Sequence, residues 1–127
     1  MNIQNEIQLN VFGEKLESCC HKPLTGYFRN GLCETDASDF GAHTVCAVVT
    51  DEFLLFSQLR GNDLITPRPE FDFPGLRPGD CWCLCASRWL EAHQAGKAPK
   101  VKLKSTNQNT LTTIEFKILR EYAIDLN

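Results

Sequence analysis

Residues 43–53, HTVCAVVTDEF, join an apolar β-branched run to a helix start, and this junction decides the fold of the chain. The run 44–49 is short and apolar on both faces, which is typical of a strand buried on both sides or at the centre of a sheet. Thr50 is a favoured N-cap residue, and the acidic pair after it lies where carboxylates interact favourably with the helix dipole. We therefore predict a strand over 44–49 and a helix over 51–60 that stops at Gly61.

A long loop and a second strand follow the predicted helix. Residues 61–80 contain four prolines, and about twenty residues is far above the usual loop length of about 4 to 6. Phe71 and Phe73 favour an ordered loop, because disordered linkers lack such aromatic residues. The pair 78–79, Pro-Gly, fits the centre of a type II turn. The strand 81–85 after it places cysteines on one face and large apolar residues on the other.

The remaining chain carries weaker patterns of alternation and helix capping. They predict a small hairpin around Asn30-Gly31, a helix over 88–95 capped by Ser87, a strand over 100–104 with outward lysines, a strand over 110–114 and a closing helix over 116–123. The expected fold is a single α+β domain over residues 1–127, built in two layers. It would hold a mostly antiparallel sheet of four or five strands, two or three helices and one long ordered loop over one end of the sheet.

Charge and hydropathy restrict the classes of partner. Sixteen acidic and thirteen basic side chains give a net charge of -3, which removes the basic surface that nucleic acid binding requires. No apolar stretch approaches the roughly 20 residues that span a bilayer, and the first residues are too polar for a signal peptide. We therefore expect a cytoplasmic protein with neither a nucleic acid nor a membrane partner. The sequence leaves formation of a homo-oligomer open.

Short phrases along nearly the whole chain share their order and spacing with one known family. They are Cys19, Pro23, Thr25-Gly26, Arg29, Gly31, Cys33, Asp39, Gly41, His43, Cys46, Thr50, Glu52-Phe53-Leu54, Gly61-Asn62-Asp63-Leu64, Thr66-Pro67, Phe73-Pro74-Gly75-Leu76, Pro78-Gly79-Asp80, Trp82-Cys83-Leu84-Cys85, Arg88-Trp89, Ala95-Gly96 and Ala98-Pro99. The chain in this respect resembles the domain of unknown function 2237 family, a set of small, mostly bacterial uncharacterised proteins. The resemblance implies a fold and a set of positions, but no activity, because the family has no established one.

The chain departs from the family pattern at one place. Members often carry Ala-Thr-His where this chain has Ser105-Thr106-Asn107. Asn107 would be a poor replacement for a histidine that binds metal or acts as a base. Because asparagine still donates and accepts hydrogen bonds, a ligand contact remains compatible with it. Cys20 and Cys81 fall outside the family pattern.

Seven cysteines are many for a reducing compartment, and an odd number cannot all pair within one chain. We expect mostly free thiols packed as small apolar side chains, with metal binding or reactivity as alternatives. The usual zinc spacing is absent, and Cys83 and Cys85 on a regular strand would hold their sulfurs about 6.5 Å apart. Two sulfurs on one tetrahedral zinc lie nearer 4 Å apart. We therefore expect no cofactor, and zinc is the alternative.

A reactive thiol would need a nearby base or a helix N-terminus that stabilises the thiolate. Cys85 comes just before the start of the predicted second helix, which satisfies this condition. His43 and Cys46 are three residues apart, so on one continuous strand their side chains point to opposite faces. The candidate reactive or metal-binding thiols are Cys19, Cys33, Cys46, Cys83 and Cys85.

Glu52 is the least expected charge, because helical periodicity places it inside the apolar arc formed by Phe53, Phe56, Leu55 and Leu59. It is either a solvated first-turn carboxylate or a partly buried one paired with an arginine or histidine. We predict a polar pocket at the end of the 44–49 strand, and its candidate ligand-binding residues are Arg29, His43, Glu52, Asn62, Asp63 and Arg88. The predicted function is small-molecule binding, and the alternative is a thiol-dependent enzyme or a Cys/His zinc protein.

Overall fold

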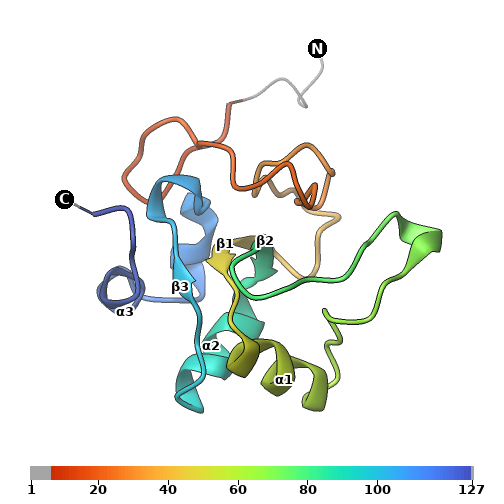
Figure 1. The fold of residues 1–127 in the computed structure, drawn as a ribbon. Helices are drawn as coiled ribbons and strands as arrows, with labels where there is room; N and C mark the ends of the chain where they lie inside the picture. The colour runs from red at the N-terminus through yellow and green to blue at the C-terminus, as the bar shows by residue number, and fades with distance from the viewer. Residues whose placement is uncertain (1–6, 127) are drawn as a thin grey trace.

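A three-stranded antiparallel sheet in the order β2-β1-β3 forms the centre of the structure, a computed structural model that describes residues 7–126 (Figure 1). The strands are β1 (His43–Val48), β2 (Cys81–Cys85) and β3 (Lys100–Val101). The fold is α+β as expected, and the first two strands lie where the sequence predicts them. The described residues form three strands rather than four or five. The predicted strand 110–114 falls mostly in the 3-10 helix Gln108–Thr112, and β3 is only two residues long, shorter than the predicted strand 100–104.

The central strand is buried on both faces, as its composition predicts. Val45 and Ala47 belong to the main apolar core, whereas Cys46 belongs to a second cluster on the other face. Across the sheet, Cys46 pairs with Cys83 and His43 pairs with Cys85, and the register shifts between His43 and Val45. Because residues directly opposite each other share a face, the two cysteines of the first pair lie side by side.

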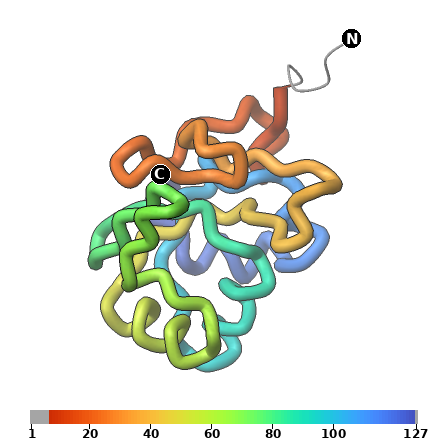
Figure 2. Tube along the Cα trace, turned by 90° about the vertical axis from the view of Figure 1, so that its right-hand side faces the viewer, coloured from red at the N-terminus to blue at the C-terminus, as the bar shows by residue number. Residues whose placement is uncertain are grey.

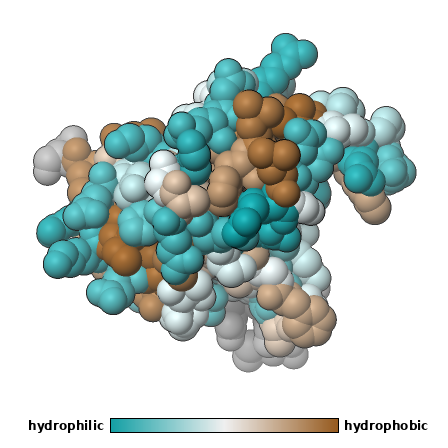
Figure 3. Space-filling model, turned by 90° about the horizontal axis from the view of Figure 1, so that it is seen from below, coloured by the Kyte–Doolittle hydropathy of each residue, from teal (hydrophilic) through white to brown (hydrophobic). Residues whose placement is uncertain are grey.

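Helix α1 (Asp51–Leu59) begins as predicted, with the Thr50 hydroxyl accepting the backbone N–H of Phe53 at 3.1 Å. Its buried residues are Phe53, Leu54 and Ser57. Leu55 and Leu59 are 56% and 84% exposed, so the predicted apolar arc is wrong. The helix is packed through only a narrow stripe, because it lies at the outer side of the fold beside α2. The lower face that carries these helices shows separate hydrophobic patches within hydrophilic surface (Figure 3).

Helices α2 (Ala86–Gln94) and α3 (Phe116–Glu121) complete the regular structure of the described residues, apart from three 3-10 helices. α2 starts directly from β2, so its N-cap is Cys85 rather than the predicted Ser87. Trp89 of α2 is fully buried, and its indole N–H donates to the Pro99 carbonyl at 3.0 Å. None of the helices in residues 7–126 combines the length and the apolar character that a bilayer crossing requires.

Residues 7–42, here called the N-terminal segment, contain no helix or strand of the sheet and lie over one side of it (Figures 1 and 2). The hairpin predicted at Asn30-Gly31 does not form. A type I′ turn needs positive φ at both central residues, but here Arg29 and Gly31 have positive φ values of 56° and 87°. A Cβ at residue 31 would also collide with the His21 ring. This segment therefore depends on tertiary contacts for its shape.

Residues 61–80, here called the long loop, are ordered as predicted. Phe73 and Leu76 are buried, and the 3-10 helix Pro69–Phe71 lies at its tip. The predicted turn at 78–79 is present, since the Asp80 N–H donates to the Arg77 carbonyl at 3.0 Å. The loop lies next to the N-terminal segment (Figure 2).

Candidate functional site

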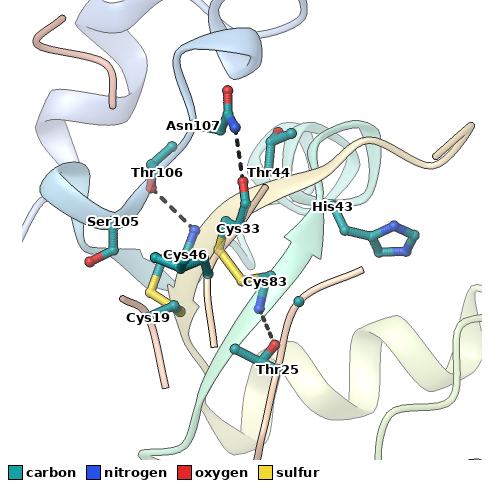
Figure 4. The surroundings of a disulfide bond; sticks show 12 residues. Cys19, Thr25, Cys33, His43, Thr44, Cys46, Cys83, Ser105, Thr106 and Asn107 are labelled. Atoms are coloured by element: carbon teal, nitrogen blue, oxygen red, sulfur yellow. Dashed lines mark hydrogen bonds between the residues drawn. A yellow bond between two sulfur atoms is a disulfide. The ribbon is translucent and has the colours of Figure 1, made fainter. Parts of the chain in front are cut away.

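Four cysteines join the N-terminal segment to the sheet through two disulfides, Cys19–Cys46 and Cys33–Cys83 (Figure 4). The prediction of mostly free thiols is therefore wrong for these four, while Cys20, Cys81 and Cys85 are free. The partners are separated by 27 and 50 residues in the chain. No local pattern could pair them, because only the docking of the segment on the sheet brings the sulfurs together.

Buried side-chain hydrogen bonds reinforce this junction (Figure 4). The Cys83 backbone N–H donates to the Thr25 hydroxyl at 2.8 Å, and the Cys46 N–H donates to the Thr106 hydroxyl at 3.2 Å. The Asn107 amide donates to the Cys33 carbonyl at 3.0 Å. Asn107 is 4% exposed, so the residue that departs from the family pattern has a structural role here.

A pocket of about 480 Å³ opens where the N-terminal segment, the long loop and β2 meet. Its wall combines basic, aromatic and polar side chains from all three regions. It is lined by Gly26, Tyr27, Arg29, His43, Asp63, Leu64, Arg68, Phe71, Phe73, Trp82 and Cys83. The pocket therefore borders the first residue of β1, whereas Val48 at the opposite end of that strand is not in its lining.

One of the two arginines of the pocket lies over an aromatic ring. The Arg29 guanidinium stands 5.3 Å from the centre of the Trp82 ring and donates to the Gly26 carbonyl at 2.8 Å. Phe73 meets the same Trp82 ring edge-to-face at 5.1 Å. No carboxylate among residues 7–126 lies within 4.0 Å of the Arg29 guanidinium, while Arg68 has one distant partner, Glu70, at 4.0 Å. The pocket thus offers a cation beside a flat apolar wall.

His43 is held in place by a buried carboxylate. Its Nδ1 lies 2.6 Å from Asp39 Oδ1, and its backbone N–H donates to Asp39 Oδ2 at 2.9 Å. The Asp39 side chain is fully buried and the His43 side chain is 40% exposed. The ring lies between Gly41, where a Cβ would approach it to 2.7 Å, and Tyr27, whose ring stacks on it at 6.1 Å. Asp39 therefore fixes one ring nitrogen and leaves Nε2 for other contacts.

A smaller pocket of about 170 Å³ shares His43 with the larger one. Cys85 and Arg88 line it from the start of α2, and Asn62 lines it from the long loop. The Cys85 sulfur lies 3.1 Å from the Ser87 hydroxyl. This pocket therefore brings a free thiol and an oriented imidazole to the same cavity.

Backbone strain concentrates around the larger pocket. The three non-glycine residues with positive φ in the described chain are Arg29, Ala42 and Asp72, at 56°, 48° and 53°. Arg29 lines the pocket, Ala42 precedes His43, and Asp72 lies between two lining phenylalanines. Such conformations cost on the order of 1–3 kcal/mol each and cluster at functional sites.

The remaining predicted site residues divide between the pockets and the helix surface. Glu52 is 63% exposed in its side chain and pairs with Lys97 at 3.2 Å, so it is the solvated first-turn carboxylate and lies outside both pockets. Arg88 donates to the Arg60 carbonyl at 3.0 Å and contacts Glu91. It thereby joins α2 to the end of α1 at the rim of the smaller pocket.

Asp63 has a local structural role in addition to its place in the pocket wall. Hydrogen bonds from the Thr66 side chain, the Thr66 N–H and the Ile65 N–H lower the pKa of the Asp63 carboxyl. Because this pKa is lowered, the carboxylate stabilises the loop at neutral pH, and that stabilisation is lost as the pH falls through the lowered pKa.

Of the predicted ligand-binding residues, the structure brings together Arg29, His43, Asn62, Asp63 and Arg88 around the two adjoining pockets. The sequence-based candidates omit Asp39, Arg68 and the aromatic wall. Only weak signals pointed to them: Asp39 lies four residues before His43, and Arg68 lies between two prolines of the long loop.

Comparison with known proteins extends the resemblance seen in the sequence. No curated protein matches this chain. A family model described as "uncharacterized protein conserved in bacteria" matches residues 9–123, which include both disulfides and every described residue of the two pockets. The chain therefore belongs to this family, domain of unknown function 2237.

Proposed function

We propose that the protein binds a small molecule that carries an anionic group and a flat apolar part, in the pocket of about 480 Å³. The observation that carries this proposal is the Arg29 guanidinium lying over the Trp82 ring without a carboxylate partner among residues 7–126. An arginine in this position can bind a carboxylate or phosphate through two parallel hydrogen bonds, while the ring beneath it contacts a flat group.

The charge and shape of the wall support the same class of ligand. Arg29 and Arg68 supply two positive charges, whereas Asp63 uses its carboxylate for hydrogen bonds within the long loop. The Trp82, Phe73 and Phe71 rings supply apolar surface, which is the usual combination in ligand sites. The strained residues around the pocket add support, because the fold retains them at an energetic cost.

The probes are benzoate and phenyl phosphate, with benzamide as the neutral counterpart. Binding is measured by the change in tryptophan emission, and Trp82→Phe and Trp89→Phe identify the reporting residue. We expect a Kd on the order of 1 mM for these small anions and no saturable binding of benzamide. Arg29→Gln should weaken binding roughly 10-fold or more, since a charged hydrogen bond is lost.

Arg120→Gln is the matched control, because Arg120 is exposed on α3 and lines neither pocket. Equal binding of benzoate and benzamide, or equal effects of the Arg29 and Arg120 substitutions, would contradict an anion site. Folding of each variant is checked by circular dichroism with both disulfides intact.

A second candidate function is thiol chemistry at Cys85. It is favoured by the Asp39–His43 hydrogen bond and by the pairing of His43 with Cys85 across the sheet. His43 Nε2 would accept the thiol proton while the sulfur attacks an electrophilic carbon. With iodoacetamide, the S–C bond forms and iodide leaves. Cys46 and Cys83 are ruled out as free nucleophiles by their disulfides.

Peptide mass spectrometry after brief alkylation of the oxidised protein measures this candidate directly. Cys85 should react at least about tenfold faster than Cys81, which lies at the other end of the same strand. His43→Gln should remove the difference. If Cys85 reacts no faster than Cys81 in the unaltered chain, the thiol candidate is discarded.

A further inference from the structure

The four disulfide-bonded cysteines form one compact sulfur cluster rather than two separate cross-links. The Sγ atoms of Cys19, Cys33 and Cys46 all lie within 4.8 Å of one another, whereas the Sγ of Cys83, which is bonded to that of Cys33, does not lie within 4.8 Å of all three. Cys46 and Cys83 are direct partners in the β1–β2 register. Two cysteines of the sheet thus face two cysteines of the N-terminal segment (Figure 4).

We propose that these four cysteines, when reduced, form a tetrathiolate site for one Zn²⁺ ion. Four cysteine thiolates are one of the common tetrahedral ligand sets of structural zinc, with Zn–S distances of about 2.3 Å and therefore S–S separations of about 3.8 Å. A disulfide holds its sulfurs about 2.05 Å apart, so opening each of the two bonds requires its sulfurs to separate by about 1.7 Å. Rotation about the Cα–Cβ bonds covers such a distance, because the Cα separations are already 5.7 and 5.2 Å.

The surroundings indicate a closed structural site. The four residues are 5%, 0%, 0% and 2% exposed in chain order, which excludes water from a fourth coordination position. The remaining cysteines are free: Cys85 lines the smaller pocket, Cys20 is partly exposed, and Cys81 is partly exposed and packs against the cluster. The bound ion would replace the two covalent links between the N-terminal segment and the sheet.

The chain with both disulfides and the reduced, metal-free chain differ by four electrons and four protons. A dithiol reductant transfers two electrons and two protons to each disulfide, giving two thiols, and is itself oxidised to a disulfide. Zn²⁺ binding then releases the four thiol protons to solvent. The same junction is therefore held by disulfides under oxidising conditions and by the metal under reducing conditions.

The experiment uses the full chain, reduced by a phosphine in the absence of oxygen, stripped with a chelator and titrated with Co²⁺ and then Zn²⁺. We expect one ion per chain, thiolate-to-cobalt charge-transfer absorption together with the d–d bands of a tetrahedral ion, and displacement by zinc. The oxidised chain is the control and should bind neither metal. Excess zinc, at about a hundredfold over Kd, should raise the Tm of the reduced chain by roughly 10 °C.

Alkylation identifies the ligands without any variant that fails to fold. In the zinc-loaded chain, Cys20, Cys81 and Cys85 should be labelled and the four cluster cysteines protected, and chelation should expose all seven. The combined substitution Cys20→Ser, Cys81→Ser and Cys85→Ser should leave metal binding unchanged. Absence of stoichiometric metal in the reduced chain, or protection of any of these three cysteines in place of a cluster cysteine, would overturn the proposal.

Discussion

The two regions that meet at the larger pocket are held together by different forces. β1, α1, β2 and α2, here called the sheet-helix half, have continuous hydrogen-bonded strands and a common apolar core. The N-terminal segment has no helix or strand of the sheet and contributes Val11 to that core. It is fixed by two disulfides and by backbone and side-chain hydrogen bonds to the rest of the chain. The comparison shows that one region folds by burying apolar surface, while the other takes its shape from the first.

The largest effect expected from this comparison is that of reducing both disulfides in the absence of metal. The loops they close contain 27 and 50 residues, which correspond to about 3.5 and 4 kcal/mol in the chain-entropy treatment. Hydrogen exchange should then accelerate in residues 7–42 much more than in β1 and β2. Uniform acceleration along the chain would show that the sheet-helix half does not keep its structure when the disulfides are reduced.

Phe53→Ala tests the other side of the comparison. Phe53 is 1% exposed within the main core, so the substitution should lower the free energy of unfolding by about 3–5 kcal/mol. Denaturant unfolding of the oxidised protein measures the loss. Leu59→Ala on the same helix is the control, because Leu59 is 84% exposed and should cost less than about 1 kcal/mol.

Thr25→Val should loosen the junction without touching a disulfide. The substitution leaves the buried Cys83 N–H without its acceptor, which costs about 1–3 kcal/mol. Thr25→Ser keeps the hydroxyl and should retain most of the stability. A larger loss in Thr25→Ser than in Thr25→Val, measured by thermal unfolding, would show that the methyl group matters more than the hydrogen bond.

Ala42→Gly should stabilise the protein, by up to about 1 kcal/mol, because residue 42 has a positive φ that glycine adopts without strain. Gly31→Ala should do the reverse, since φ there is 87° and the added Cβ would meet the His21 ring. Chemical denaturation distinguishes the two. A loss of stability in the Ala42 variant would mean that the residue is not strained.

Glu52→Gln is expected to have the smallest effect, below about 0.5 kcal/mol, because the ion pair that Glu52 forms with Lys97 is exposed on both sides. Thermal unfolding at low and high salt measures it. A loss above about 1 kcal/mol would revive the interpretation of Glu52 as a partly buried, partnered carboxylate.

The elements predicted well are those governed by local chemistry. Thr50 caps α1 through its own hydroxyl, and the Pro-Gly pair at 78–79 makes its turn within four residues. The prediction of a strand over 110–114 was wrong because Gln108–Thr112 packs against β1 as a 3-10 helix, with the Thr110 hydroxyl donating to the Thr44 hydroxyl, and strand pairing is a tertiary matter. The predicted apolar arc of α1 was wrong because helical periodicity does not determine which side of the helix is buried against a neighbouring element.

Local sequence patterns were sufficient to predict four features: β1 to within one residue at each end, the helix after it, the ordered long loop and the alternation of cysteine with large apolar residues in β2. Each of these depends on interactions between residues a few positions apart. The disulfide partners, the course of the N-terminal segment and the meeting of Arg29, His43 and Trp82 follow from long-range packing. Contacts across 27 to 50 residues are selected by the packing of the whole chain, and no local pattern encodes that selection.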